Sequence, residues 1–198
     1  MNSQEDESTL VAHLEYFSDR LLRVFSHSFF TIEFQNDKDL CHPDSIKDCR
    51  RLMLHVIRDA CLNETLIALR DIDDFLVPRE CSSRNEKGRT KARASDLLAS
   101  DFGYLENKTF LSASERTDIN QLIAHTTKRG PEVYQQNWDV WELVSKCVSQ
   151  CSSFLDWVEQ QHKSHFLLFT AALNCRVTTR KIYEAVHAAR DDHQTSQV

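Results

Sequence analysis

The sequence predicts an all-α fold, an up-and-down bundle of four to five long helices, and three observations indicate it. The 198-residue chain has three glycines and three prolines, whereas antiparallel sheets need turn residues about every 8–12 positions. Apolar residues recur at steps of three and four over long stretches, which is typical of one buried helical face. Hydrophobic residues form 41% of the chain, enough to fill the core of one domain. We therefore expect residues 1–198 to fold as a single helical-bundle domain.

The first helix is predicted over residues 8–30. Its apolar positions follow one another at helical spacing: Leu10, Leu14, Phe17, Leu21, Phe25 and Phe29. The polar segment 35–43 should end this helix, and Pro43 is a residue type that commonly begins the next one. Residues 1–8 are acidic and polar, so we expect them to form a disordered tail.

The second helix, over residues 44–76, should be the longest because it contains neither glycine nor proline. A helical wheel places these residues on one broad apolar face: Met53, Leu54, Ile57, Ala60, Cys61, Ile67, Ala68, Ile72 and Phe75. Glu64 and Asp71 fall inside that face. A carboxylate there is costly unless it is paired, so each should meet a cation or donor from another helix, with Arg129 and His125 as candidates. Alternatively, the helix turns both carboxylates to the edge of the core.

Residues 79–94 are predicted to form a mobile loop rich in serine, arginine and lysine. Within this loop, residues 84–93 carry one acid, Glu86, and five cations: Arg84, Lys87, Arg89, Lys91 and Arg93. A basic arm of this kind can hold RNA phosphates by releasing counterions, and it can equally be a solvated surface loop.

A short helix over residues 95–102 and an irregular, aromatic-bearing segment over residues 103–111 should follow. Ser112 and Glu115 then have the spacing of a capping box, which predicts that the third long helix starts there. This helix should continue to residue 129, because glycine and proline come next.

The last two long helices are predicted over residues 138–161 and 164–190. The first of them has apolar residues at the alternating steps of bundle packing: Trp141, Val144, Val148, Cys151, Leu155 and Val158. The second is apolar at first and charged later, and residues 191–198 should form a disordered tail.

Charge, cysteines and hydropathy restrict the setting in which the chain acts. No signal-peptide pattern opens it, and its longest apolar run, residues 166–173, is too short to cross a bilayer. The seven cysteines are odd in number and contain no C-x-x-C pair, so we interpret them as reduced thiols of a cytoplasmic protein with no membrane attachment. The net charge of -6 argues against a uniformly basic surface that coats duplex DNA.

Residues 115–141 carry the most informative pattern, because a single histidine, His125, follows an apolar helical stretch and precedes basic residues. Eight of these residues resemble the helix that opens the C-terminal pair of HEPN-superfamily proteins, especially those of abortive-infection systems: Ile119, Asn120, Ile123, Ala124, His125, Thr126, Trp138 and Asp139. The resemblance implies a helical bundle that forms a homodimer. It also implies RNA binding and, in active members, RNA cleavage by an arginine, a polar neighbour and a histidine, without metal or other cofactor.

The chain departs from that pattern because no arginine stands just before His125. Arg116 lies nine positions earlier, which places it on the opposite face of one helix. Lys128 and Arg129 lie three and four positions after His125 and share its face. We therefore expect His125 to transfer the proton and Arg129 to hold the phosphate, as a neutral-pKa imidazole and a guanidinium can. Asn120 would position the RNA and Lys128 would contact its phosphates.

Two other classes of function stay open at this point. In the first, the motif is a relic and the chain is a non-catalytic module for dimerisation or for binding a protein partner. In the second, two E-x-x-H pairs, Glu159 with His162 and Glu184 with His187, form a di-metal site of the kind found in some helical bundles. Both pairs fall near the polar ends of their helices, so we expect no metal.

Overall fold

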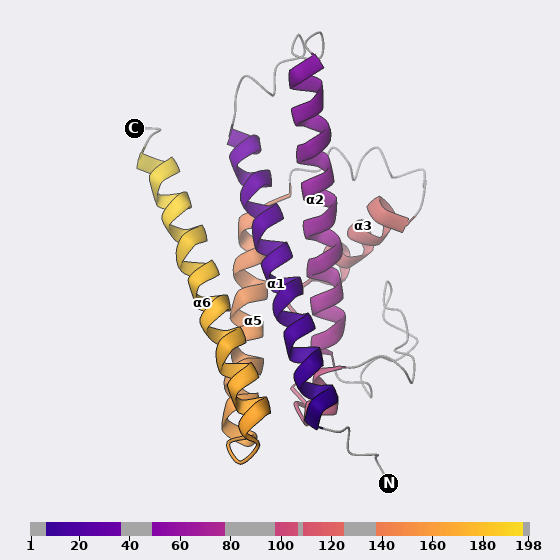
Figure 1. Ribbon diagram of the computed structural model, residues 1–198. Coiled ribbons are helices and arrows are strands. Elements are labelled where there is room, and N and C mark those ends of the chain that lie inside the picture. Colours follow the sequence, from indigo (N-terminus) through magenta and orange to yellow (C-terminus); the bar gives the residue numbers. More distant parts are fainter. Residues whose placement is uncertain (1–6, 37–48, 78–97, 107–108, 125–137, 196–198) are drawn as a thin grey trace.

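The computed structural model describes residues 7–36, 49–77, 98–106, 109–124 and 138–195, and over these ranges the predicted all-α bundle is confirmed. Helices α1 (Glu7–Asn36) and α2 (Cys49–Leu76) form one antiparallel pair, and α5 (Val140–Gln161) and α6 (Phe166–Thr195) form another (Figure 1). The two pairs pack so that α1 lies against α2, α5 and α6. Helices α2 and α5 run in the same direction, because the segment between them, which includes α3, returns the chain to the other end of the bundle.

Helix α1 contributes a regular stripe to the core. The first four predicted core positions, Leu10 to Leu21 in steps of three and four, are buried, and Val24 continues the stripe. The helix begins one residue earlier than predicted and extends to Asn36, beyond the predicted end at residue 30.

The buried residues of helix α2 lie in its C-terminal half, and none of the N-terminal residues whose burial is described is buried. The predicted apolar face is confirmed at Ala68 and Ile72, which are buried. Met53 and Ile57 are exposed instead, because the first turns of α2 extend past the other helices of the bundle (Figure 1). The predicted start of this helix at residue 44 lies outside the described residues.

Phe154 of α5 is fully buried at the point where the two helix pairs meet. Its ring makes edge contacts with four other aromatic rings, at centroid distances of 5.3–5.7 Å: Phe17, Phe75, Phe102 and Tyr104. These rings come from α1, α2 and the segment 98–106, so one aromatic cluster joins elements that are far apart in sequence.

Two elements differ in length from the prediction: the short helix before Gly103 is shorter, and the last helix is longer. The predicted helix at 95–102 is a short 3-10 helix, η3 (Ala99–Phe102), closed by Gly103, whose φ of 90° favours glycine. Helix α6 continues to Thr195, so residues 191–195, which we expected to begin a disordered tail, are helical. The predicted loop 79–94 lies outside the described residues.

Among the helices described, none combines the length and the apolarity needed to cross a membrane.

Candidate functional site

Helix α3 (Ala113–Ala124) carries the first part of the motif and begins where its capping box predicts. The Glu115 amide donates to Ser112 Oγ at 3.1 Å, and the Ser112 amide donates to Glu115 Oε2 at 2.6 Å. These reciprocal bonds satisfy two amides that no helical carbonyl can reach. The structure describes α3 as far as Ala124, the residue that precedes His125 in the sequence.

A buried ion pair holds α3 against α2. The Arg116 guanidinium contacts Oδ2 of Asp73, and Oδ1 of Asp73 accepts hydrogen bonds from the amides of Phe110 at 2.8 Å and Leu111 at 3.2 Å. The side chains of Arg116 and Asp73 are 4% and 0% exposed. One carboxylate of α2 therefore fixes both α3 and the segment that leads into it.

Burial lowers the pKa of Arg116, and repulsion from Arg70 lowers it further. With its charge neutralised by Asp73 and its side chain buried, Arg116 is not available to hold a substrate phosphate. Helical spacing excludes Arg116 for a different reason, because nine positions place it on the helix face opposite His125.

Asn120 is the one predicted catalytic residue that lies in the described part of the chain. It is half-buried and lies one turn beyond Arg116, about 40° further around the helix. Ile119 beside it is fully buried, which fixes the rotation of α3 about its axis. The position of Asn120 is therefore determined by two buried neighbours.

The remaining predicted site residues lie outside the described residues, and the predictions for them stay untested. These are two catalytic and six nucleic-acid-binding residues: His125, Arg129, Arg84, Lys87, Arg89, Lys91, Arg93 and Lys128.

The two carboxylates that were expected to need partners differ. Asp71 pairs with a cation of another helix, as predicted, but the cation is Arg20 of α1, with Arg20 Nη1 3.2 Å from Asp71 Oδ2. Glu64 is exposed, so the alternative of an edge position applies to it. The fully buried carboxylate of α2 is Asp73, which reasoning from the sequence missed. Its spacing from Leu69 and Leu76, four residues before and three after, places it in the buried stripe and could have identified it.

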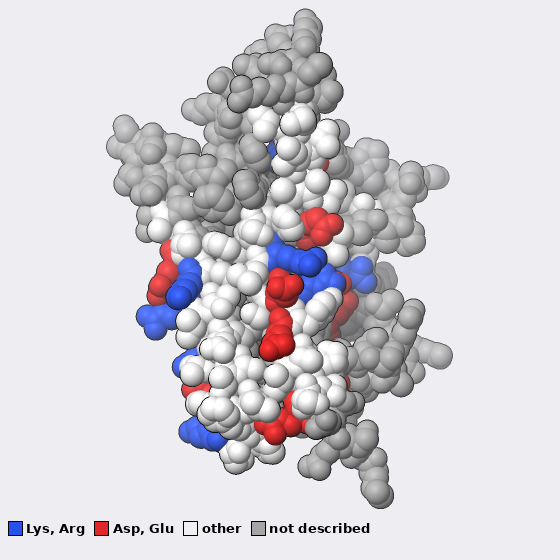
Figure 2. All heavy atoms as spheres, viewed as in Figure 1, with Lys and Arg blue, Asp and Glu red and all other residues white. Residues whose placement is uncertain are grey.

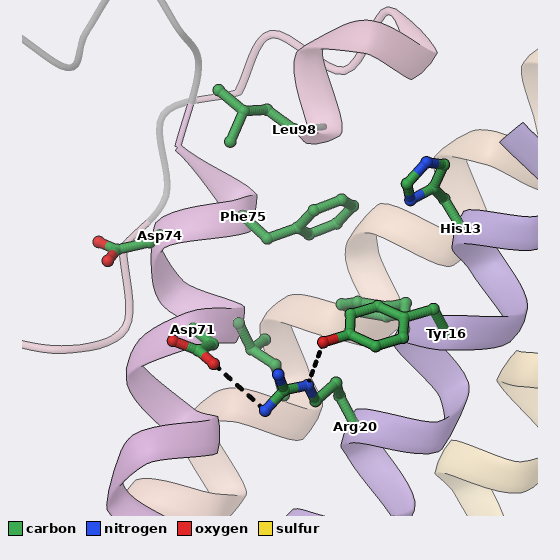
Figure 3. Close-up of a pocket in the computed structure, with 9 residues that line it drawn as sticks. His13, Tyr16, Arg20, Asp71, Asp74, Phe75 and Leu98 are labelled. Atoms are coloured by element: carbon green, nitrogen blue, oxygen red, sulfur yellow. Dashed lines mark hydrogen bonds and ion pairs between the residues drawn. The ribbon is translucent and has the colours of Figure 1, made fainter. Parts of the chain in front are cut away.

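A pocket of about 370 Å³ lies between α1 and α2, where Asp71 and Arg20 meet (Figure 3). Nine residues line it: His13, Tyr16, Phe17, Arg20, Asp71, Ile72, Asp74, Phe75 and Leu98. Arg20 Nε donates to the Tyr16 hydroxyl at 2.8 Å, and the centre of the guanidinium lies 5.1 Å from the Tyr16 ring centroid. This pocket was not foreseen from the sequence, because its walls come from α1, α2 and Leu98 of the segment that follows α2.

Burial and neighbouring polar groups together set the protonation behaviour of the pocket. It raises the pKa of Asp71 by more than the nearby charges of Arg20 and Arg70 lower it. For Arg20, burial lowers the pKa, but the Tyr16 hydrogen bond and the charge of Asp71 outweigh it, so the net shift is upward. The guanidinium therefore stays charged.

The side chains of the two E-x-x-H pairs, which were considered as metal ligands, contact other protein groups instead. Arg176 Nε lies 3.2 Å from Glu159 Oε2, and His162 Nε2 lies 3.1 Å from the Phe102 carbonyl oxygen. In the second pair, Arg180 Nε donates to Glu184 Oε1 at 2.8 Å, and the His187 ring packs edge-on against Trp141. Within the described ranges, no three His, Cys, Asp or Glu side chains form a group that could hold a metal ion.

Cys61, Cys147, Cys151 and Cys175 are free thiols, and the last three are buried. Burial raises the pKa of Cys151 strongly and that of Cys175 to about 11. Thiolates are the reactive form of cysteine, so these two residues are core side chains rather than nucleophiles.

No family model, curated protein or solved structure matches this chain. The resemblance to the HEPN superfamily therefore rests on residues 115–141 themselves.

Proposed function

We propose that the chain is a HEPN-like, cytoplasmic RNA-binding protein that forms a homodimer and cleaves RNA without a metal, as in abortive-infection or toxin-antitoxin systems. The observation that carries the proposal is the attachment of α3, whose buried Arg116–Asp73 pair fixes the helix that bears Asn120 and leads directly to His125. A reactive group needs a rigid support, and α3 holds the first residues of the motif, Ile119 and Asn120, in a helix packed against α2.

The proposed chemistry is attack of a ribose 2'-hydroxyl on the adjacent phosphorus. A 2',3'-cyclic phosphate forms as the bond to the 5'-oxygen breaks, and that oxygen leaves as a hydroxyl after taking a proton from solvent. His125 takes the proton of the hydroxyl, and the guanidinium of Arg129 binds the phosphate oxygens. The side chain of Asn120, a half-buried residue, holds the RNA in place, since its position is determined by buried neighbours on α3. In a homodimer, the second subunit would contribute another copy of each group.

Phosphate binding is assigned to the basic arm at residues 84–93 together with Lys128. On the face of the bundle shown in Figure 2, described Lys and Arg side chains lie beside Asp and Glu side chains, and most of the described surface is uncharged. Such a mixed surface attracts phosphates weakly, whereas the arm has five cations and one acid.

The test is incubation of the purified chain with single-stranded RNA in EDTA, followed by gel analysis of the products. Wild type should cleave the RNA, and His125→Ala should still bind it but lose about 100-fold or more of the rate, the usual contribution of a general base. His165→Ala is the matched control, because His165 is an exposed histidine at the α5–α6 turn. Absence of both binding and cleavage in wild type would refute the proposal.

The role of the arm is tested by the salt dependence of RNA binding. Replacing its five cations with glutamine should weaken binding and reduce the slope of log K against log salt by about 0.7 for each phosphate that the arm no longer neutralises. An unchanged slope would assign phosphate binding to another surface.

A second candidate function, a non-catalytic dimerisation module, is favoured by one surface. Met53 and Val56 of α2 are each 61% exposed, and Ile57 is exposed beside them. Apolar side chains clustered at the protruding end of a helix are suited to burial against another protein. If Met53→Lys with Val56→Lys converts a dimer to a monomer, and wild type does not bind RNA, this function replaces the first.

A further inference from the structure

The pocket between α1 and α2 has the size and lining of a small-molecule site. Its volume of about 370 Å³ falls in the range of ligand pockets, which is roughly 300–1,000 Å³. Its inner wall is apolar, with Phe17, Ile72 and Leu98 buried, and charged side chains stand at one edge. This combination of an apolar wall and a few convergent polar groups is typical of sites that orient a ligand.

Flat groups border the open part of this pocket. In Figure 3 the rings of His13 and Tyr16 on α1 face the ring of Phe75 on α2 across the same space. Tyr16 is 57% exposed although it is a large aromatic residue, and its ring lies beside the planar guanidinium of Arg20. Aromatic rings and arginine planes are the surfaces on which unpaired nucleobases stack. The lining therefore favours a flat aromatic ligand.

The polar edge of the pocket places an acceptor next to a donor. The Arg20 guanidinium can only donate hydrogen bonds and the Asp71 carboxylate can only accept them, and they lie 3.2 Å apart. The side chain of Asp71 is 46% exposed, and its pair with Arg20 engages Oδ2, so the carboxylate can accept further hydrogen bonds from a ligand. Asp74, one turn further along α2, lines the same pocket.

This edge is complementary to one nucleobase in particular. Guanine presents two adjacent donors, N1–H and the N2 amino group, which match the two oxygens of a carboxylate, and next to them the acceptor O6, which matches a guanidinium. Adenine and cytosine present one amino donor beside ring acceptors, and uracil presents one donor between two acceptors. We propose that the pocket between α1 and α2 binds a guanine base, with Asp71 and Arg20 reading its edge and Tyr16 stacking on its face.

The proposal goes beyond the ribonuclease function, because the pocket and α3 lie on different sides of α2. Asp71 faces α1 and Asp73 faces α3, and the two positions are about 200° apart around the helix. The base could therefore belong to a free guanine nucleotide or to a single-stranded RNA, and the two sources are distinguished by experiment.

The direct test is isothermal titration of the full chain with GMP, AMP, CMP and UMP. GMP should bind about tenfold or more tightly than the other three, the discrimination expected of a bidentate contact, and Asp71→Asn should remove that preference. Asp156→Asn is the matched control: Asp156 pairs with Arg176 of another helix at 3.0 Å, is 49% exposed, and lies outside the pocket. Equal binding of all four nucleotides, or an equal reduction in the control variant, would overturn the proposal.

A second variant and a second ligand complete the test. Tyr16→Ala should weaken GMP binding about tenfold while leaving the far-ultraviolet circular dichroism unchanged, because stacking on an exposed ring is removed. Oligonucleotides with and without a single guanine, titrated into His125→Ala, then identify the source. If oligonucleotide binding depends on the guanine and is lost in Asp71→Asn, the site binds guanine within RNA. If GMP binds but RNA does not, the proposed guanine site is supported and the proposed ribonuclease function is refuted. If RNA binds, GMP does not, and Asp71→Asn leaves RNA binding unchanged, the proposed guanine site is refuted and the ribonuclease proposal is unaffected.

Discussion

Asp71 and Asp73 stand two residues apart on α2, and each forms an ion pair with an arginine of a different helix. Asp73 is fully buried and holds three groups: the guanidinium of Arg116 and two backbone amides. Asp71 is 46% exposed and pairs with Arg20 at the edge of a pocket. The same residue type on one helix thus occupies two environments, because a two-residue step turns the side chain by about 200°.

The difference shows how burial decides the role of an ion pair. Removing one partner of a buried pair leaves an uncompensated charge in the core, which costs about 3–5 kcal/mol. An exposed pair is screened by water and contributes roughly 0–1 kcal/mol. Asp73 is therefore assigned to stability and to the placement of α3, whereas Asp71 can be used for binding.

Asp73→Asn should have the largest effect on stability. It leaves the charge of Arg116 buried without a counterion, so the free energy of unfolding should fall by about 3–5 kcal/mol in urea denaturation. Asp156→Asn, which removes a half-exposed carboxylate, should change it by less than about 1 kcal/mol. Equal decreases in the two variants would contradict the distinction between buried and exposed pairs.

Combining Asp73→Asn with Arg116→Met should recover part of the stability, because the second substitution removes the uncompensated charge. We expect the double variant to be about 1–3 kcal/mol more stable than Asp73→Asn alone. Additive effects in the double-mutant cycle would mean that Asp73 acts through the amides of Phe110 and Leu111 rather than through Arg116.

Asp71→Asn should change the free energy of unfolding by less than about 1 kcal/mol near neutral pH, since its ion pair is partly solvated. The variant should keep the far-ultraviolet spectrum and the urea m-value of wild type. A destabilisation as large as that of Asp73→Asn would assign Asp71 to the framework of the bundle.

The pH dependence of stability should show the smallest effect. Because burial raises the pKa of Asp71 above 3.8, the folded chain holds this proton to a higher pH than the unfolded chain does. This contribution to stability is present below pH 3.8 and is lost as the pH rises through the folded-state pKa. Wild type should therefore lose stability relative to Asp71→Asn over that interval, as measured by urea denaturation at a series of pH values. An opposite slope would mean that Arg20 outweighs burial.

Local pattern predicts the helices well and the contacts between them less well. Leu14 and Phe17 were placed in the core by spacing alone, and Ser112 with Glu115 marked the start of α3, because both signals depend on neighbours within one or two turns. The partner of Asp71 was misassigned and the pocket was missed, since both depend on how α1 lies against α2. The exposure of Met53 likewise depends on how far α2 extends beyond the bundle, which its own periodicity does not encode.

Of the candidate site, the sequence placed Asn120 on α3 but did not identify the ion pair that fixes this helix. The spacing of Asp73 places it in the core, but spacing alone does not show which cation pairs with it. A carboxylate in a core stripe can be recognised as structural only when that partner is known. The roles of His125 and Arg129 stay predictions from the motif.

Thermal unfolding with and without GMP tests the division of roles between the two carboxylates most directly, because ligand that binds the folded state raises the Tm. Asp73→Asn should lower the Tm by about 10 °C, whereas Asp71→Asn should leave it within about 3 °C of wild type. GMP should raise the Tm of wild type more than it raises the Tm of Asp71→Asn, which keeps only the weaker binding expected for the other nucleotides. A Tm of Asp71→Asn that falls as far as that of Asp73→Asn, or that GMP raises as much as it raises wild type, would contradict the account.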